Sequence, residues 1–175
     1  NPEDPELPER LQRLRQVATD TNKEWSDKLG INQSAAITCV KPSGTVSQLV
    51  LSPSGIHPGH DYYYFRRVRS DNKDPLTKHL ISAGVPHEPD VMKPHATTVF
   101  TFPMKLPEAS VTRNDVDAIK HLELWLQYQR HWCEHKPSIT VSVKESEWPE
   151  VGAWVWKHFD EMSGVSFLPF SDHVY

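Results

Sequence analysis

Short apolar runs alternate with longer stretches of amphipathic pattern along this chain, and the alternation restricts the fold more than any other feature. Five of the runs, rich in β-branched and aromatic residues, are predicted strands. They cover residues 35–40, 62–68, 97–102, 138–143 and 165–168. Because strands separated by helices are joined by right-handed crossovers, the pattern predicts an α/β fold with a mainly parallel sheet and flanking helices. The strands and their helices would form an open half-barrel.

The stretches between these runs carry helix signals. A proline-rich, acidic leader loop at residues 1–8 precedes a first helix, which Gly30 should end. Thr112 and Asp115 resemble a capping box at the start of the longest helix. A loop is expected at residues 86–94. The predicted helices cover residues 7–29, a short turn after Thr45, and residues 74–81, 112–133 and 147–162.

Composition limits the classes of protein. A chain of 175 residues with 37% hydrophobic residues is expected to form a single domain, spanning 1–175, with a real core. The net charge of −4 argues against a nucleic-acid groove. The absence of a long apolar run or signal peptide predicts a cytoplasmic protein that makes no membrane contact. Cys39 and Cys133 form no disulfide framework. The chain starts at Asn1 and stops at Tyr175 without a polar tail, so we expect a piece of a longer protein.

The strongest functional signal is the turn that follows the first predicted strand. Six residues form it: Pro42, Ser43, Gly44, Thr45, Val46 and Ser47. Gly44 permits either a positive φ or the close approach of a ligand to the backbone, and Thr45 is a good N-cap for a short helix. Such a turn directs backbone N–H groups and hydroxyls at one point, which suits a phosphate. The same pattern is also typical of a plain connection between a strand and a helix.

Several further motifs follow in order. They are residues 41–47 (KPSGTVS), 52–58 (SPSGIHP), 62–69 (YYYFRRVR), 135–143 (HKPSITVSV), Glu147-Trp148, 164–170 (GVSFLPF) and 172–175 (DHVY). From about Trp25 onward, this set resembles the adenosylcobalamin-dependent (class II) ribonucleoside-triphosphate reductases. The resemblance implies a ten-stranded α/β barrel made of two antiparallel halves. This chain would be about half of that barrel, in the C-terminal part of the catalytic domain.

The resemblance also implies a function. The longer enzyme would convert ribonucleotides to deoxyribonucleotides by thiyl-radical chemistry, with adenosylcobalamin as cofactor. Residues 42–47 would bind the substrate phosphates, through the hydroxyls of Thr45 and Ser47 and the N–H groups of Gly44, Thr45 and Val46. Lys41 would either add charge there or point to solvent. Neither Cys39 nor Cys133 matches a catalytic cysteine of the family, so the isolated chain should hold no catalytic residue and be inactive. It need not bind the cofactor by itself.

Other polar clusters have simpler explanations. Arg67 and Arg69 share one face of a predicted strand and Arg66 takes the other. A salt-bridged strand is favoured over charge near the nucleotide. The pairs His131/His135 and His57/His60 lack a full set of metal ligands, so no metal site is predicted.

Two alternatives to the reductase function remain open. One is a stand-alone α/β module that binds a phosphorylated ligand without chemistry. The other is a split-protein half that complements a partner chain. The expected partners are a ribonucleotide and the missing N-terminal barrel half. A homo-oligomer through exposed sheet edges is a further possibility.

Overall fold

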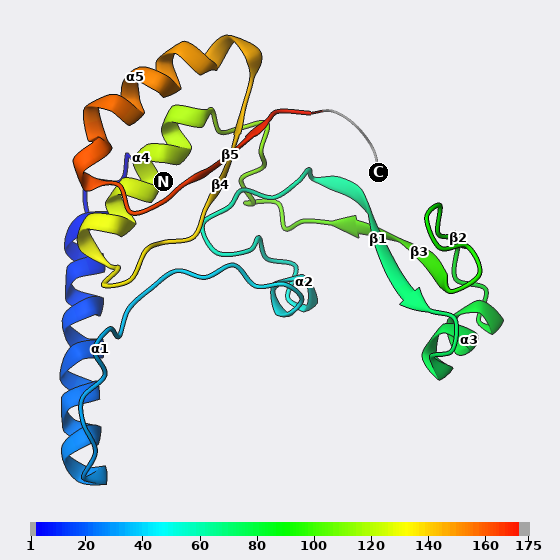
Figure 1. Cartoon of the computed structure of the whole chain (residues 1–175), viewed down its shortest axis with the longest axis horizontal. Coiled ribbons are helices and arrows are strands. Elements are labelled where there is room, and N and C mark those ends of the chain that lie inside the picture. Colours follow the sequence, from blue (N-terminus) through cyan, green and yellow to red (C-terminus); the bar gives the residue numbers. More distant parts are fainter. Residues whose placement is uncertain (1–2, 172–175) are drawn as a thin grey trace. The chain divides into compact units, whose positions relative to one another are not determined.

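The structure, a computed structural model, describes residues 3–171 (Figure 1). The predicted motif at 172–175 and the first two residues of the predicted leader lie outside this range. By its internal contacts the chain divides into two compact units, which are described separately. The first unit comprises residues 3–59 and 111–171, and the second comprises residues 60–110. That the chain forms one domain of a longer barrel remains a prediction.

The first unit begins with a long helix, α1 (Leu7–Leu29), as its apolar spacing predicted. Gly30 ends it in the left-handed region at φ 65°, where the absence of a Cβ removes the usual strain. The leader is shorter than expected because the helix already starts at Leu7, with proline in its first turn. Leu7 and Leu11 are buried, whereas Trp25 is 53% exposed.

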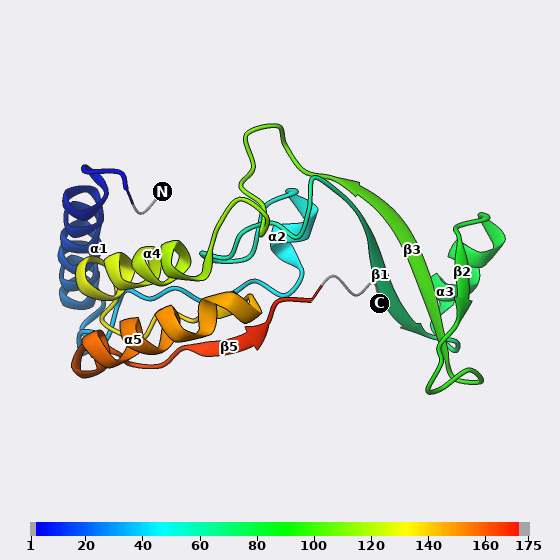
Figure 2. The ribbon, with the colours of Figure 1, turned by 90° about the horizontal axis from the view of Figure 1, so that it is seen from above.

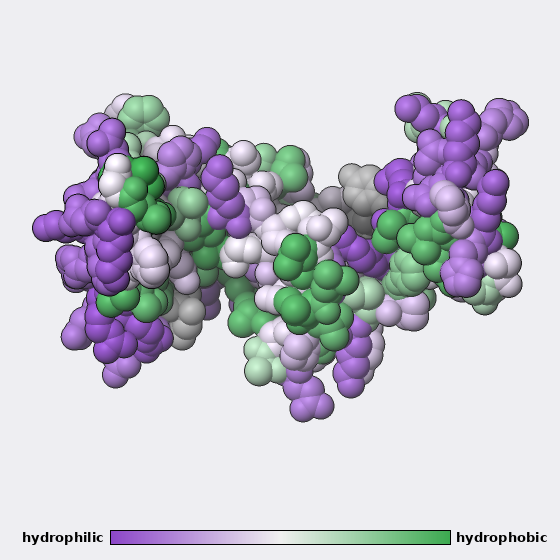
Figure 3. Space-filling model, turned by 90° about the horizontal axis from the view of Figure 1, so that it is seen from below, coloured by the Kyte–Doolittle hydropathy of each residue, from purple (hydrophilic) through white to green (hydrophobic). Residues whose placement is uncertain are grey.

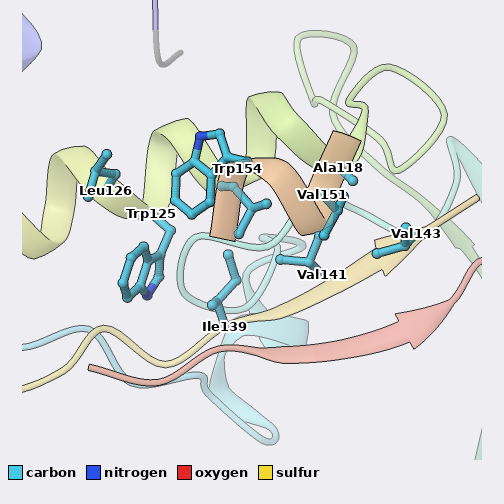
Figure 4. Close-up of a cluster of buried hydrophobic side chains, with 9 residues drawn as sticks. Ala118, Trp125, Leu126, Ile139, Val141, Val143, Val151 and Trp154 are labelled. Carbon is cyan, nitrogen blue, oxygen red and sulfur yellow. The ribbon is translucent and has the colours of Figure 1, made fainter. Parts of the chain in front are cut away.

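The core of this unit lies between two helices and a pair of parallel strands (Figure 2). The helices are α4 (Ala118–His131) and α5 (Trp148–His158), and the strands are β4 (Thr140–Val143) and β5 (Ser166–Pro169). Two 3-10 turns, η1 (Glu145–Glu147) and η2 (Phe159–Glu161), flank α5. The buried cluster in Figure 4 consists of Ala118, Leu122, Trp125, Leu126, Ile139, Val141, Val143, Val151 and Trp154.

The second unit is an antiparallel sheet with one small helix. Its strand order is β1 (Tyr63–Asp71), β3 (Thr97–Lys105) and β2 (His87–Pro89), and β1 pairs with β3 over its whole length. Helix α3 (Pro75–Ser82) follows β1, and Asp74 caps it by accepting the Leu76 N–H. The loop predicted at residues 86–94 therefore contains a short strand.

The prediction of a mainly parallel sheet is wrong for this chain, because among the described strands only β4 and β5 pair in parallel, whereas β1, β3 and β2 are antiparallel. In a parallel βαβ unit, the helix must carry the chain back along the full length of the first strand before the next strand can begin. Helix α3 has eight residues and is about 12 Å long, whereas the nine residues of β1 extend about 30 Å. The chain therefore returns through β3 itself, which makes the pair antiparallel.

The strand predicted at residues 35–40 does not form either. Its backbone is extended, but its hydrogen bonds go to the end of α4 and the coil beyond it. The Glu134 N–H donates to Thr38 O at 2.9 Å, and the Ser138 N–H donates to Val40 O at 3.0 Å. The Glu134 carboxylate accepts the Ile37 N–H at 2.6 Å. These bonds hold the segment against residues beyond α4 without sheet pairing.

The helix predicted at residues 112–133 starts later and is not the longest. Asp115 does accept from both the N–H and the hydroxyl of Thr112, but this bond closes a turn. Asp117 caps α4 instead, accepting the Lys120 N–H at 2.7 Å. The longest helix among the described residues is α1, with 23 residues. None of the described helices combines the length and the apolar character needed to cross a membrane.

Candidate phosphate site

The predicted phosphate loop, residues 42–47, joins the extended segment to a single helical turn, α2 (Val46–Leu49), in the first unit. Thr45 occupies the N-cap position, as predicted, but its hydroxyl makes no capping hydrogen bond. Ser43 takes that role, because its Oγ accepts the Ser47 N–H at 3.0 Å. The turn is therefore held by Ser43, which leaves the Thr45 hydroxyl exposed for other contacts.

Three consecutive N–H groups of this loop have no acceptor. Within the described residues, no hydrogen bond is formed by the backbone N–H of Gly44, Thr45 or Val46. All three residues are exposed. Unpaired, accessible N–H donors in succession are the groups that bind an anion in a backbone concavity. The loop can therefore supply the predicted donors.

The backbone of Gly44 does not take a positive φ, so a left-handed conformation does not explain the glycine at this position. A Cβ built on Gly44 meets no atom within 4 Å, so the protein's own packing does not require glycine either. The space in front of the Gly44 backbone is therefore open to the approach of another group.

Ser47 behaves differently from the exposed Thr45. It is 9% exposed, and its Oγ has no hydrogen-bond partner among the described groups. A buried hydroxyl without a partner costs free energy, so a ligand or water that reached it would be stabilised. Of the two predicted hydroxyl donors, Thr45 is therefore exposed and Ser47 is buried.

A small hollow lies beside the loop. It is lined by Val40, Lys41, Pro42, His135, Lys136 and Ser138. No ion pair is formed by Lys41 or Lys136 with the acidic groups of the described residues. Two lysines without acidic partners make this edge of the loop favourable for an anion.

Two of the arginines of β1 form ion pairs. Arg67 pairs with Glu88, and Arg69 Nε donates to Asp90 Oδ2 at 2.8 Å. The hydrogen bond from Arg69 and the backbone N–H of Lys93 hold the pKa of Asp90 below its usual value. The ion-pair explanation therefore holds for Arg67 and Arg69, which share one face as predicted.

The histidine pairs are not assembled as metal sites. His131 Nδ1 lies 2.9 Å from Gln12 Nε2, and both ring nitrogens of His57 contact backbone groups. In the part of the chain that the structure describes, no group of three or more His, Cys, Asp or Glu side chains is placed to hold a metal ion.

The two cysteines differ in environment. Cys39 is exposed, whereas Cys133 is buried, and burial raises the pKa of its thiol to about 11. A thiol with a raised pKa is a poor nucleophile because little of it is thiolate near neutral pH. No disulfide joins them.

Comparison with known proteins relates the chain to a family of enzymes. The chain is 33% identical to the adenosylcobalamin-dependent ribonucleoside-triphosphate reductase of Euglena gracilis over 147 residues, which is 83% of this chain and 20% of that protein. It is 29% identical to the same enzyme of Lactobacillus gasseri over 171 residues, 95% of this chain and 23% of that protein. A scan against models of protein families finds no match.

The fold comparison agrees. A crystal structure of a B12-dependent (class II) ribonucleotide reductase superposes with a TM-score of 0.84 at 25% identity, over 98% of this chain and 24% of that one. Over nearly its whole length, the chain is therefore similar to ribonucleotide reductases in sequence and fold. Within that class its relatives are the adenosylcobalamin-dependent ribonucleoside-triphosphate reductases, which confirms the resemblance seen in the motifs. The chain spans only 20% to 24% of the length of these relatives.

The signal that sequence reasoning missed is in the second motif, SPSGIHP. Ser54 Oγ donates to Ser43 O at 2.8 Å, which places this motif against the phosphate loop. Gly55 has φ +61°, and a Cβ there would lie 3.4 Å from the Val40 side chain. A glycine that needs both a left-handed φ and a close approach indicates two packed loops. The sequence gives only a weak sign of this contact, the Pro-Ser-Gly that residues 42–44 and 53–55 share.

Proposed function

We propose that this chain is part of an adenosylcobalamin-dependent ribonucleotide reductase and that residues 42–47 hold the phosphates of its ribonucleotide substrate. The longer protein would convert ribonucleotides to deoxyribonucleotides by thiyl-radical chemistry. The observation that carries the phosphate assignment is the run of three exposed, unpaired N–H groups at Gly44, Thr45 and Val46. The open space at Gly44 supports it, since a phosphate oxygen can approach the backbone there.

The role of this chain is binding rather than radical chemistry. Cys133 is buried, no disulfide joins it to Cys39, and neither cysteine resembles a catalytic cysteine of the family in its surroundings. The radical cysteine and the reducing cysteine pair would be supplied by the remainder of the protein.

Adenosylcobalamin, when bound to the longer protein, would supply the initial radical. The hollow at the loop has six lining residues and cannot enclose a cofactor of that size. The residues of this site therefore do not fit the cofactor, and we assign them to the substrate alone.

The proposed partner is the N-terminal half of the barrel. Four residues on and beside α2 leave apolar side chains exposed: Val46, Leu49, Val50 and Leu51. Figure 3 shows apolar side chains gathered in this region. An apolar patch rimmed by polar residues is typical of a surface that another part of a protein covers.

The test uses the full-length protein that contains this chain. Thr45→Ala removes a hydroxyl donor to a charged group, which should raise KM for a ribonucleoside triphosphate by about tenfold to a hundredfold. Gly44→Val should raise it more, because a branched side chain blocks the approach to the backbone. Gly152→Val is the matched control, since Gly152 lies in α5 and its Cβ would also meet open space. Unchanged KM in both loop variants would show that the loop is only a connection.

The same variants address the binding-module alternative. If the isolated chain folds and binds inorganic triphosphate in calorimetry, and Thr45→Ala abolishes that binding, the site is complete without a second barrel half. Binding seen only in the full-length protein favours the reductase proposal.

A further inference from the structure

Both ring nitrogens of His57 are used by backbone groups. The Thr140 N–H, at the start of β4, donates to His57 Nε2 at 2.9 Å, and His57 Nδ1 lies 2.7 Å from Ser54 O. A backbone N–H is always the donor, so Nε2 must be unprotonated and Nδ1 must carry the proton that is donated to Ser54 O. The imidazole is therefore neutral, in one tautomer, and has no free nitrogen for a ligand.

Ser54 extends this connection to the phosphate loop. Its Oγ donates to Ser43 O at 2.8 Å, and Ser43 Oγ in turn accepts the Ser47 N–H at 3.0 Å. An unbroken series of hydrogen bonds thus runs from Thr140 through the His57 ring and Ser54 to both ends of the turn that displays the free N–H groups.

Packing supports the same connection. We call residues 52–58 the brace segment. Its Gly55 lies against the start of the phosphate loop, where an added Cβ would be 3.6 Å from Pro42 Cα. Its Ile56 O accepts a hydrogen bond from Nε2 of the buried His121 in α4, at 3.0 Å. The brace segment is therefore held by β4, by α4 and by the loop itself.

We propose that His57 is a positioning residue for the phosphate loop: it fixes the brace segment to β4, so that Ser54 can hold Ser43 and keep the N–H groups of residues 44–46 aligned. The inference rests on the proposed function and deepens it. His57 would not touch the phosphates, because both of its nitrogens are already occupied. It would act on substrate binding and not on the chemical step.

Two conservative substitutions separate its two hydrogen bonds. In the full-length protein, His57→Asn places an amide near the position of Nδ1, so the bond to Ser54 O can form but the side chain is too short to reach Thr140. His57→Gln places an amide oxygen near the position of Nε2, where it can accept the Thr140 N–H. We expect His57→Asn to raise KM for a ribonucleoside triphosphate about tenfold, with kcat within twofold of wild type, as the loss of one hydrogen bond implies. His57→Gln should stay within about threefold of the wild-type KM.

Inorganic triphosphate is the second probe. As a competitor it reports on the phosphate loop alone, so its inhibition constant should rise in His57→Asn by the same factor as KM. Binding of the corresponding nucleoside, which has no phosphates, should not change. The proposal would be overturned if His57→Asn and His57→Gln had the same KM, or if either variant lowered kcat while KM stayed unchanged.

A double-mutant cycle tests whether the residues act in series. Ser54→Ala removes the bond to Ser43 O and leaves the His57–Thr140 bond in place. If the brace works as proposed, His57→Asn combined with Ser54→Ala should raise KM no more than the larger single effect, because the connection is already broken. Additive effects would contradict it. Ser54→Ala also provides the test if His57→Asn fails to fold.

The two proposals fail in different ways. If Thr45→Ala and Gly44→Val leave KM unchanged, the phosphate assignment is wrong. If those variants lose affinity while His57→Asn and Ser54→Ala bind as wild type, the phosphate assignment stands and the positioning role of His57 is wrong.

Discussion

His121 lies edge-on to His57, with 5.9 Å between the ring centroids, and each ring holds a backbone group of the first unit. Burial lowers the pKa of His121 to about 4, an effect that its hydrogen bond to Ile56 O only partly offsets. Because His121 is 5% exposed, its neutral form is part of the folded structure.

Acid should therefore destabilise this unit in a defined pH window. The unfolded chain protonates His121 near pH 6.5, whereas the folded chain does so only near pH 4. The contribution of neutral His121 to the free energy of unfolding is complete above pH 6.5. It falls by roughly 3 kcal/mol as the pH decreases from 6.5 to 4. Urea unfolding of the protein from pH 7.5 to 4.5 measures this loss.

The control removes the titrating group. His121→Gln keeps an amide that can donate to Ile56 O but does not titrate, so the variant should lose less stability between pH 6.5 and 4.5. The pKa of His131 is also lowered by desolvation and acts in the same direction, so the comparison rests on the difference between variant and wild type. Identical slopes for both proteins would show that His121 is not buried in neutral form.

Trp125 should be the most sensitive core position. It is fully buried, and its Nε1 donates to Pro137 O at 3.0 Å. Trp125→Ala should lower the free energy of unfolding by about 3–5 kcal/mol, through lost burial and the cavity that remains. Trp125→Phe should cost roughly 1–3 kcal/mol, since the Pro137 carbonyl loses its donor.

Trp156 provides the comparison for this prediction. It lies in the same unit but is 86% exposed, so Trp156→Phe should change the free energy of unfolding by less than about 0.5 kcal/mol. Denaturant unfolding of the three variants checks the order. A larger loss for Trp156→Phe than for Trp125→Phe would mean that the exposed ring packs against a partner in the protein as measured.

Local signals in the sequence predicted local structure well. The spacing of apolar residues and Gly30 fixed the extent of α1, and Asp74-Pro75 marked the start of α3. These elements depend on residues near in sequence, such as a cap or a stop signal. The family resemblance also came from motifs that can be read directly.

Pairing between distant segments was not predictable in the same way. Residues 62–68 are mostly aromatic, which favours a strand but does not determine whether its neighbour runs parallel or antiparallel. Similarly, the extended backbone at residues 37–40 is bound by Glu134 and Ser138, nearly a hundred residues away. Such partners are decided by tertiary packing.

The candidate site shows the same division. The turn at residues 42–47 lies where it was predicted, and the N–H groups of Gly44, Thr45 and Val46 are unpaired among the described residues, whereas phosphate binding there stays a prediction. That Ser43 rather than Thr45 caps the turn depends on side-chain rotation. The connection through His57 and Ser54 depends on Thr140, in a strand far along the chain.

The isolated chain should show no reductase turnover. Neither Cys39 nor Cys133 resembles the radical or reducing cysteines of the related reductases in its surroundings, Cys133 is buried, and no disulfide joins the two. Purified chain supplied with adenosylcobalamin, a ribonucleoside triphosphate and a dithiol should give no deoxyribonucleotide by chromatography. Turnover that Cys39→Ser abolishes would show that this cysteine has a catalytic role.

The apolar surface on α2 should make the isolated chain self-associate. Leu49 is 84% exposed and Val50 is 68% exposed, and both lie beside the phosphate loop. Exposing such residues to water is unfavourable by about 25 cal/mol per Å² of apolar surface, so two copies gain by covering them. Sedimentation velocity over a range of concentrations should show dimers or larger species.

Leu49→Lys should shift the chain toward monomer, because a charge in the contact must be desolvated. Val91→Lys makes the same change at a residue that is 90% exposed in the second unit, and it should leave the association as it is. A wild-type chain that remains monomeric at high concentration would mean that the apolar side chains of α2 are tolerated in water. The proposed barrel partner would then have to bind at another surface.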